Sequence, residues 1–103
     1  MARIESESRK LTLKEGSTTL TLDKESGKAI LQQKAFFFSK KPVEFALADI
    51  DDIAVKTDKD GLSGATIYHA VLHRRSGETT VLTTGEARET EAAVKELRGF
   101  VGL

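Results

Sequence analysis

The chain of 103 residues contains no cysteine and no tryptophan, and it has a single proline and a single tyrosine. Without cysteine it forms no disulfide and has no thiolate nucleophile, a composition typical of a reducing compartment such as the cytoplasm. Lys and Arg together number 16, as do Asp and Glu, so the formal net charge is zero. Nucleic-acid-binding proteins usually carry a basic excess, so this balance argues against nucleic acid as a partner.

Long apolar runs are missing as well. The longest span only a few residues, far short of the roughly 20 that a membrane-spanning helix needs. The first residues, MARIESESRK, have no apolar centre and do not resemble a secretory signal. We therefore expect a cytoplasmic protein, and we expect membrane-surface contact only if the sequence belongs to a longer membrane protein.

Short stretches with alternating apolar residues, separated by turn residues, fill most of the sequence. KLTLKEG and STTLTLDKESG place leucine at every second position, which is the period of half-buried strands. Five similar stretches lie at residues 28–38, 43–50, 52–58, 65–75 and 78–84. Together with the first two they give seven expected strands. In the segment at residues 43–50, we expect Val43, Phe45 and Leu47 to share one face.

The two ends of the chain differ from this pattern. Residues 1–8 are polar and aperiodic, so we expect a flexible arm there and a single domain at residues 9–103. From Glu86 to Leu103 the period changes to three and four residues, which predicts an amphipathic helix. Thr83, three residues before Glu86, is the expected capping residue.

The segment VEFALADIDDIAV (residues 43–55) resembles the passage from the fourth to the fifth strand of bacterial pleckstrin-homology-like (PH-like) domains, with Leu47, Ile50 and Ile53 at its apolar positions. IYHAVLHRRSGETTVLTT (residues 67–84) resembles the hairpin before the closing helix of those domains, and AVKELRGFVGL resembles the end of that helix. The resemblance implies a mainly β fold, a PH-like barrel of about seven antiparallel strands capped by a C-terminal helix. It also implies binding or scaffolding in place of catalysis.

Many eukaryotic PH domains bind inositol phosphates through basic residues at the first hairpin. Here the first two turns carry charges of both signs: Lys14, Glu15, Lys24, Glu25 and Lys28. This mixture argues against an anionic headgroup as ligand. We therefore expect a protein partner or a second copy of the chain. One alternative is the cytosolic regulatory domain of a small bacterial membrane protein, and a small enzyme is a further one.

Two patterns suggest metal binding, and each fails on geometry or sequence. His69 and His73 have helical zinc spacing, but on a strand they lie about 13 Å apart, too far for one zinc ion. If Gly61 took the sixth place of a calcium-binding loop, Lys56 and Ile67 would stand where carboxylates are required. We therefore expect turn or strand roles for these residues and for the Asp residues at 49–52, and no resident metal.

The usual sequence signatures of catalysis are also absent. The chain has no G-x-S-x-G elbow and no cysteine nucleophile, and GLSG at residues 61–64 lacks the lysine and spacing of a phosphate loop. We expect no catalytic residue, no cofactor and no small-molecule substrate.

Three adjacent phenylalanines, Phe36, Phe37 and Phe38, cannot all enter one core from a strand, because alternate side chains point to opposite faces. A regular strand leaves Phe36 and Phe38 on the polar face, whereas a bulge near residues 32–33 would bury them and expose Phe37. Next to two lysines, exposed rings would form an apolar patch suited to a partner. The candidate partner-binding residues are Phe36, Phe38, Lys40 and Lys41.

Overall fold

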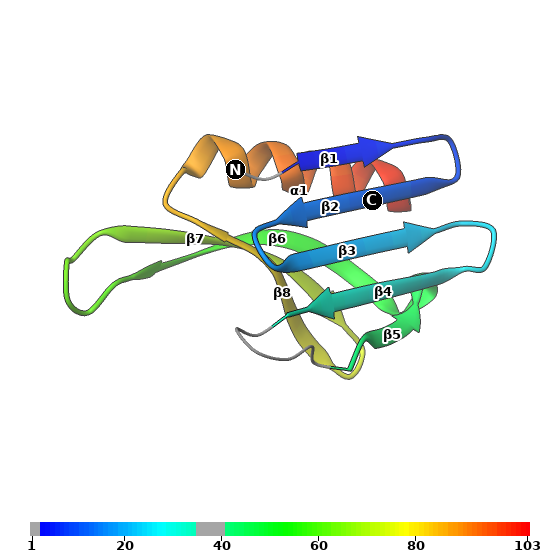
Figure 1. The fold of residues 1–103 in the computed structure, drawn as a ribbon, viewed down its shortest axis with the longest axis horizontal. Coiled ribbons are helices and arrows are strands. Elements are labelled where there is room, and N and C mark those ends of the chain that lie inside the picture. The colour runs from blue at the N-terminus through cyan, green and yellow to red at the C-terminus, as the bar shows by residue number, and fades with distance from the viewer. Residues whose placement is uncertain (1–2, 35–40) are drawn as a thin grey trace. The chain divides into compact units, whose positions relative to one another are not determined.

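The computed structural model describes residues 3–34 and 41–103, which form eight strands, one short 3-10 helix and one C-terminal α-helix (Figure 1). The strands make two separate antiparallel sheets, one of five strands and one of three. The chain divides into two compact units, Met1–Asp49 and Ile50–Leu103, each of which contains one sheet. The mainly β class with a C-terminal helix is confirmed, whereas the strands do not close into one seven-stranded barrel.

The first sheet is a meander in which each strand pairs with the next along the chain, in the order β1-β2-β3-β4-β5. Its strands are β1 (Arg3–Ser6), β2 (Lys10–Glu15), β3 (Thr18–Asp23), β4 (Lys28–Gln33) and β5 (Val43–Ala46). The turn between β2 and β3 has only two residues, and its first residue, Gly16, has a φ of 57°. A side chain there would strain the backbone, so glycine makes this tight hairpin possible.

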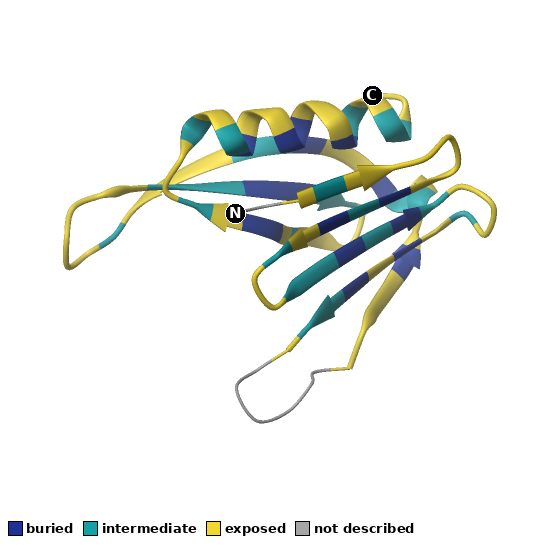
Figure 2. Cartoon of the chain, turned by 45° about the horizontal axis from the view of Figure 1, so that its top comes forward, coloured by how far each residue is buried: buried dark blue, intermediate teal, exposed yellow. Residues whose placement is uncertain are grey.

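Leucines from neighbouring strands meet on one face of this sheet. Leu11 lies opposite Leu22, and Leu13 lies opposite Leu20. Figure 2 shows the resulting alternation of buried residues with more exposed ones along β2 and β3. The fully or nearly fully buried residues of the unit are Leu11, Leu13, Leu20, Leu22, Ala29, Leu31 and Phe45. The alternation read from the sequence therefore identified the buried face correctly.

The structure differs from expectation at both ends of the first unit. Arg3–Ser6, within the expected arm, form a strand in which Ile4 lies opposite Leu13. Ile4 contributes the only apolar side chain of that strand, so the pairing depends mainly on backbone hydrogen bonds and carries little sequence signal.

At the other end, the strand stops at Ala46 and a 3-10 helix, Leu47–Asp49, follows. The N–H of Leu47 donates to the carbonyl oxygen of Gly27 at 2.8 Å, which continues the register of β4 and β5 by one residue before the chain turns. Val43 is 45% exposed, so of the three residues expected to be buried on one face only Phe45 is buried.

The second sheet contains β6 (Ile50–Lys59), β7 (Thr66–Arg74) and β8 (Gly77–Thr84) in the order β6-β7-β8. Two irregularities interrupt the ladders. One lies at the start of β6, between Ile50 and Asp52, and the other leaves Val81 of β8 without a partner in β7. Tyr68 is the first β7 residue paired with β8, so the end of the β6–β7 hairpin is a two-stranded ribbon (Figure 1).

Helix α1 (Ala87–Val101) packs on all three strands of this sheet. Its buried residues are Thr90, Ala93, Val94 and Leu97. The last three lie on the predicted apolar stripe, whose other two residues, Phe100 and Val101, are half-buried. The predicted cap by Thr83 is wrong. The N-cap residue is Glu86, with no capping hydrogen bond from its side chain, and the hydroxyl oxygen of Thr84 accepts the N–H of Glu86 at 3.2 Å. Thr83 instead points to the opposite face of β8, where it meets His69.

In the part of the chain that the structure describes, no helix is long and apolar enough to cross a membrane.

Candidate interaction edge along β6

Among the described residues β6 pairs with β7 alone, so it is an edge strand of its sheet. From Asp52 to Lys59 its pairing with β7 is regular, with Ile53 opposite Leu72 and Val55 opposite Ala70. The second half of the strand, from Lys56 to Lys59, is exposed to solvent. An edge strand of this kind presents backbone groups that can pair with another chain.

The contacts of Ile53 reveal which backbone groups point away from β7. The carbonyl oxygen of Ile53 accepts a hydrogen bond from Nη1 of Arg98 at 2.9 Å, and its N–H donates to the carboxylate of Asp52. Both groups therefore face the open side of the strand. Because antiparallel partners alternate between hydrogen-bonded and non-hydrogen-bonded pairs, the backbone groups of Val55, Thr57 and Lys59 face the same way.

An ion pair closes this edge at Ile53. Arg98 on α1 reaches the carboxylate of Asp52, and the same guanidinium also binds the Ile53 carbonyl. The N–H of Ile53 is the main cause that lowers the pKa of Asp52, and the hydrogen bond from Arg98 and the nearby His73 lower it further. The edge is thus already occupied at Ile53, whereas among the described residues no side chain binds the backbone of Val55 or Thr57.

A shallow groove of about 480 Å³ runs between β6 and α1, beside this edge. It is lined by Val55 and by helix and C-terminal residues: Glu91, Val94, Lys95, Arg98, Gly99 and Leu103. Gly99 widens it, because a Cβ at this position would meet no atom within 4 Å. The groove thus offers apolar walls with charged side chains on α1, directly next to the outward-facing backbone of β6.

The opposite face of the second sheet carries a polar network around Val71. Nδ1 of His69 lies 2.9 Å from Oγ1 of Thr83, and Nδ1 of His73 lies 3.4 Å from Glu78. Lys56 Nζ lies 3.7 Å from the same carboxylate of Glu78. Lys56 is opposite His69 on one side of β7, and Glu78 is opposite His73 on the other. The Lys56–Glu78 ion pair therefore crosses β7 above Val71, which is only 1% exposed.

The two histidines therefore have separate partners, each on β8. Across residues 3–34 and 41–103, no three His, Asp or Glu side chains gather in a way that could hold a metal ion. The Asp residues of the β6–β7 loop are likewise engaged locally. Asp60 accepts hydrogen bonds from the hydroxyl of Ser63 at 2.7 Å and from the N–H groups of Leu62 and Ser63, and these bonds lower its pKa.

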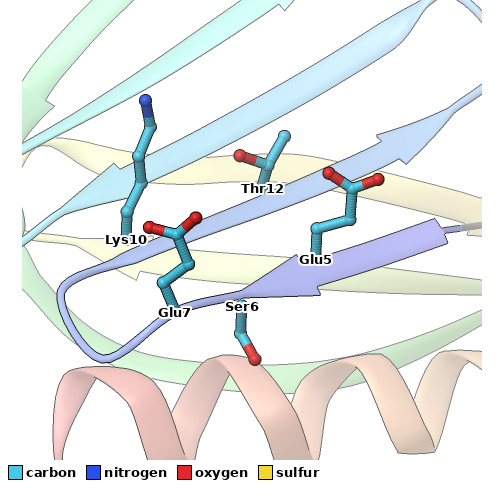
Figure 3. A pocket seen from close by; sticks show the side chains of 5 residues that line it. All are labelled: Glu5, Ser6, Glu7, Lys10 and Thr12. Carbon is cyan, nitrogen blue, oxygen red and sulfur yellow. The ribbon is translucent and has the colours of Figure 1, made fainter.

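A second depression lies on the first sheet, at the end of β1 and the start of β2 (Figure 3). It is lined by Glu5, Ser6, Glu7, Lys10 and Thr12. Glu5, Lys10 and Thr12 rise from one face of the sheet, whereas Ser6 points to the other. The exposed carboxylates and the ammonium group offer no nucleophile–base pair, so the arrangement has no evident chemistry.

Of the four candidate partner-binding residues, Phe36, Phe38 and Lys40 lie outside the described residues, and Lys41 is exposed. β4 keeps a regular register with β3 through Gln33, so the bulge considered near residues 32–33 is not present. The exposure of the phenylalanine rings stays a prediction.

The sequence did not point to the β6 edge, because its two defining residues, Asp52 and Arg98, are 46 positions apart. Comparison adds no further assignment: no protein family model matches the sequence, and no curated protein or solved structure was found to be similar.

Proposed function

We propose that the chain is a non-catalytic PH-like module of the cytoplasm that binds or scaffolds proteins, and that its β6 edge takes up an extended segment of a partner. The order of elements supports the PH-like assignment, since successive antiparallel strands in two sheets precede a C-terminal helix.

The outward-facing backbone of Val55 and Thr57 is the observation that carries this proposal. An extended segment that adds to such an edge gains main-chain hydrogen bonds, and neighbouring pockets select its alternate side chains. The groove beside Val55 supplies such a pocket, with Val94 as an apolar wall and with Glu91 and Lys95 among its lining residues. The edge and the groove together thus provide both affinity and selectivity.

The polar side chains of the second unit support a non-catalytic role. His69 and His73 contact Thr83 and Glu78, and Asp52 is held by Arg98 and by a backbone N–H. None of these groups pairs a nucleophile with a base at the bottom of a cavity, which acyl or phosphoryl transfer would require.

Amide hydrogen exchange combined with selection from random displayed peptides tests the proposal. At a dilution at which the chain is monomeric and free of peptide, the amides of Val55 and Thr57 should exchange rapidly, whereas those of Ala54 and Lys56, which face β7, should be protected and serve as the internal reference. A selected peptide should protect Val55 and Thr57.

Thr57→Pro should abolish that binding, because it removes an outward N–H and leaves the ladder with β7 intact. Selected peptides that protect other strands, or that still bind Thr57→Pro, would show that the β6 edge is not the binding site.

A further inference from the structure

We propose that the segment that pairs with β6 is β6 of a second copy, added antiparallel and centred on Thr57, so that two sheets join into one across a twofold axis. This inference rests on the proposed function of the β6 edge and names its partner. The argument depends on the direction of the backbone groups and on the order of charges along Val55–Lys59.

The backbone restricts the ways in which two copies of β6 can pair. Hydrogen bonds form only where outward-facing residues of one copy lie opposite outward-facing residues of the other. The backbone groups of Val55, Thr57 and Lys59 face outward, whereas those of Lys56 and Asp58 face β7. In the single chain the N–H of Lys59 donates to the Asp58 carboxylate at 2.9 Å, a bond that the added strand would replace. Only pairings centred on a residue satisfy this condition, because any pairing centred between two residues sets outward groups against inward ones.

The charges select one of these pairings. Centred on Thr57, the pairing places Lys56 of each copy opposite Asp58 of the other, which makes two matched pairs of opposite charge. A centre at Lys56 would set lysine against lysine, and a centre at Asp58 would set aspartate against aspartate. Like charges directly opposite each other destabilise a strand pair, so the pairing centred on Thr57 is favoured over those centred on Lys56 and on Asp58.

The same register fits the groove beside α1. It places Lys59 of the second copy opposite Val55, on the face of the sheet that carries α1. The aliphatic stem of that lysine would cover the apolar side of the groove, and its ammonium group would be directed toward Glu91. Lys59 and Glu91 are both exposed in the single chain.

The surroundings of the edge leave room for this partner. Between Tyr68 and the tip of the β6–β7 hairpin, no other strand of the described part of the chain pairs with it, and Thr57, Asp58 and Lys59 are exposed. The formal net charge of the chain is zero, so two copies do not repel each other as a whole. The Arg98–Asp52 pair, which already occupies the backbone of Ile53, sets the limit of the shared ladder.

Charge exchange between two variants tests the proposal. Sedimentation equilibrium should show a dimer for the unmodified chain. Lys56→Asp and Asp58→Lys should each raise the dimer dissociation constant by about tenfold or more, because each variant sets like charges opposite each other. An equimolar mixture of the two should recover the dimer as a heterodimer, since aspartate then faces lysine at both positions. Lys28→Asp, which disrupts the Lys28–Glu44 pair of the first sheet, is the matched control and should leave the dimer unchanged.

Cysteine trapping provides a second measurement that does not depend on charge. The chain has no cysteine, so Thr57→Cys introduces a single thiol. Its Cα should lie about 5.5 Å from its counterpart in the second copy, within the range that a disulfide spans. Mild oxidation should therefore link two Thr57→Cys chains, whereas Thr80→Cys, on exposed β8 surface, should not form this link.

The outcomes separate this inference from the function on which it rests. A chain that stays monomeric, or a dimer that is indifferent to Lys56→Asp, Asp58→Lys and Thr57→Pro, would overturn pairing through β6. If the chain were monomeric and bound extended peptides, and if Thr57→Pro abolished that binding, the proposed interaction function would be supported. Only the identification of a second copy as the partner would then be wrong.

Discussion

Arg98 of α1 and Asp52 of β6 form an ion pair that ties the end of the helix to the edge of the sheet, although 46 positions separate them in sequence. The Arg98 guanidinium also binds the carbonyl oxygen of Ile53, and Asp52 accepts the N–H of the same residue. The two side chains thus replace a neighbouring strand at Ile53, and the Asp58 carboxylate accepts the N–H of Lys59 at 2.9 Å, so the edge is open at Val55 and Thr57 between them.

Asp52→Asn should reduce stability in a manner that depends on pH. The Ile53 N–H and Arg98 hold the pKa of Asp52 below its usual value in the folded chain. A carboxyl with a lowered folded pKa stabilises the fold above its unfolded pKa, and this contribution is lost as the pH falls through the folded value. The variant should therefore be less stable at pH 6, and the difference should narrow below about pH 4.

Urea denaturation at a series of pH values measures this difference, and Asp51→Asn, which changes an exposed neighbour, is the control. A difference that stays constant down to the acid limit would mean that the charge of Asp52 contributes nothing to stability.

Leu97→Ala should cost about 2–5 kcal/mol of unfolding free energy, because it removes buried methyl groups and leaves a cavity. Leu97 has a relative exposure of 0% and lies on the face of α1 that packs on the second sheet. Glu96→Ala, one residue earlier and exposed, is the matched control. A loss below about 1 kcal/mol would mean that the helix is peripheral to the core.

Gly99→Ala should raise stability by about 0.5–1 kcal/mol, because glycine inside a helix loses more backbone entropy on folding than alanine. The added methyl group would meet no atom within 4 Å. Gly102→Ala should do the opposite, since Gly102 ends the helix with a φ of 84°. Thermal denaturation of the two variants compares them directly, and a destabilised Gly99→Ala would show that the groove is narrower than described.

Replacement of Phe36 and Phe38 together by serine should leave the unfolding free energy nearly unchanged, because exposed rings contribute little burial. Buried rings would instead cost about 3–5 kcal/mol each. Urea denaturation distinguishes the two cases, and an unfolded double variant would place the rings in the core.

Local periodicity was sufficient to predict much of the fold. Alternating leucines identified the buried faces of β2 and β3, and the change of period after Glu86 identified α1, because both signals depend only on which neighbouring side chains share a face. β1 was missed for the same reason, since a strand with one apolar residue has almost no periodicity.

The separation into two sheets and the open edge of β6 were beyond such reasoning. Both depend on which strands pair, and periodicity does not encode the order of strands. β5 ends at Ala46, where the 3-10 helix Leu47–Asp49 begins, and the alternation of Val43, Phe45 and Leu47 does not indicate this end. The groove depends on Val55 meeting Val94 and Gly99 across the sheet and helix, which only the folded chain brings together.

Because Val81 of β8 has no partner in β7, correct packing of this strand depends more on its number of residues than on their types. Because Val81 is an extra residue in the ladder, it and Leu82 are both buried although they are adjacent. Loss of one residue between Thr79 and Val81 would move every residue on one side of the gap to the opposite face of the sheet. Homologous sequences, when they are compared, should therefore tolerate exchanges among apolar side chains here but show insertions and deletions only in the turn at Ser76.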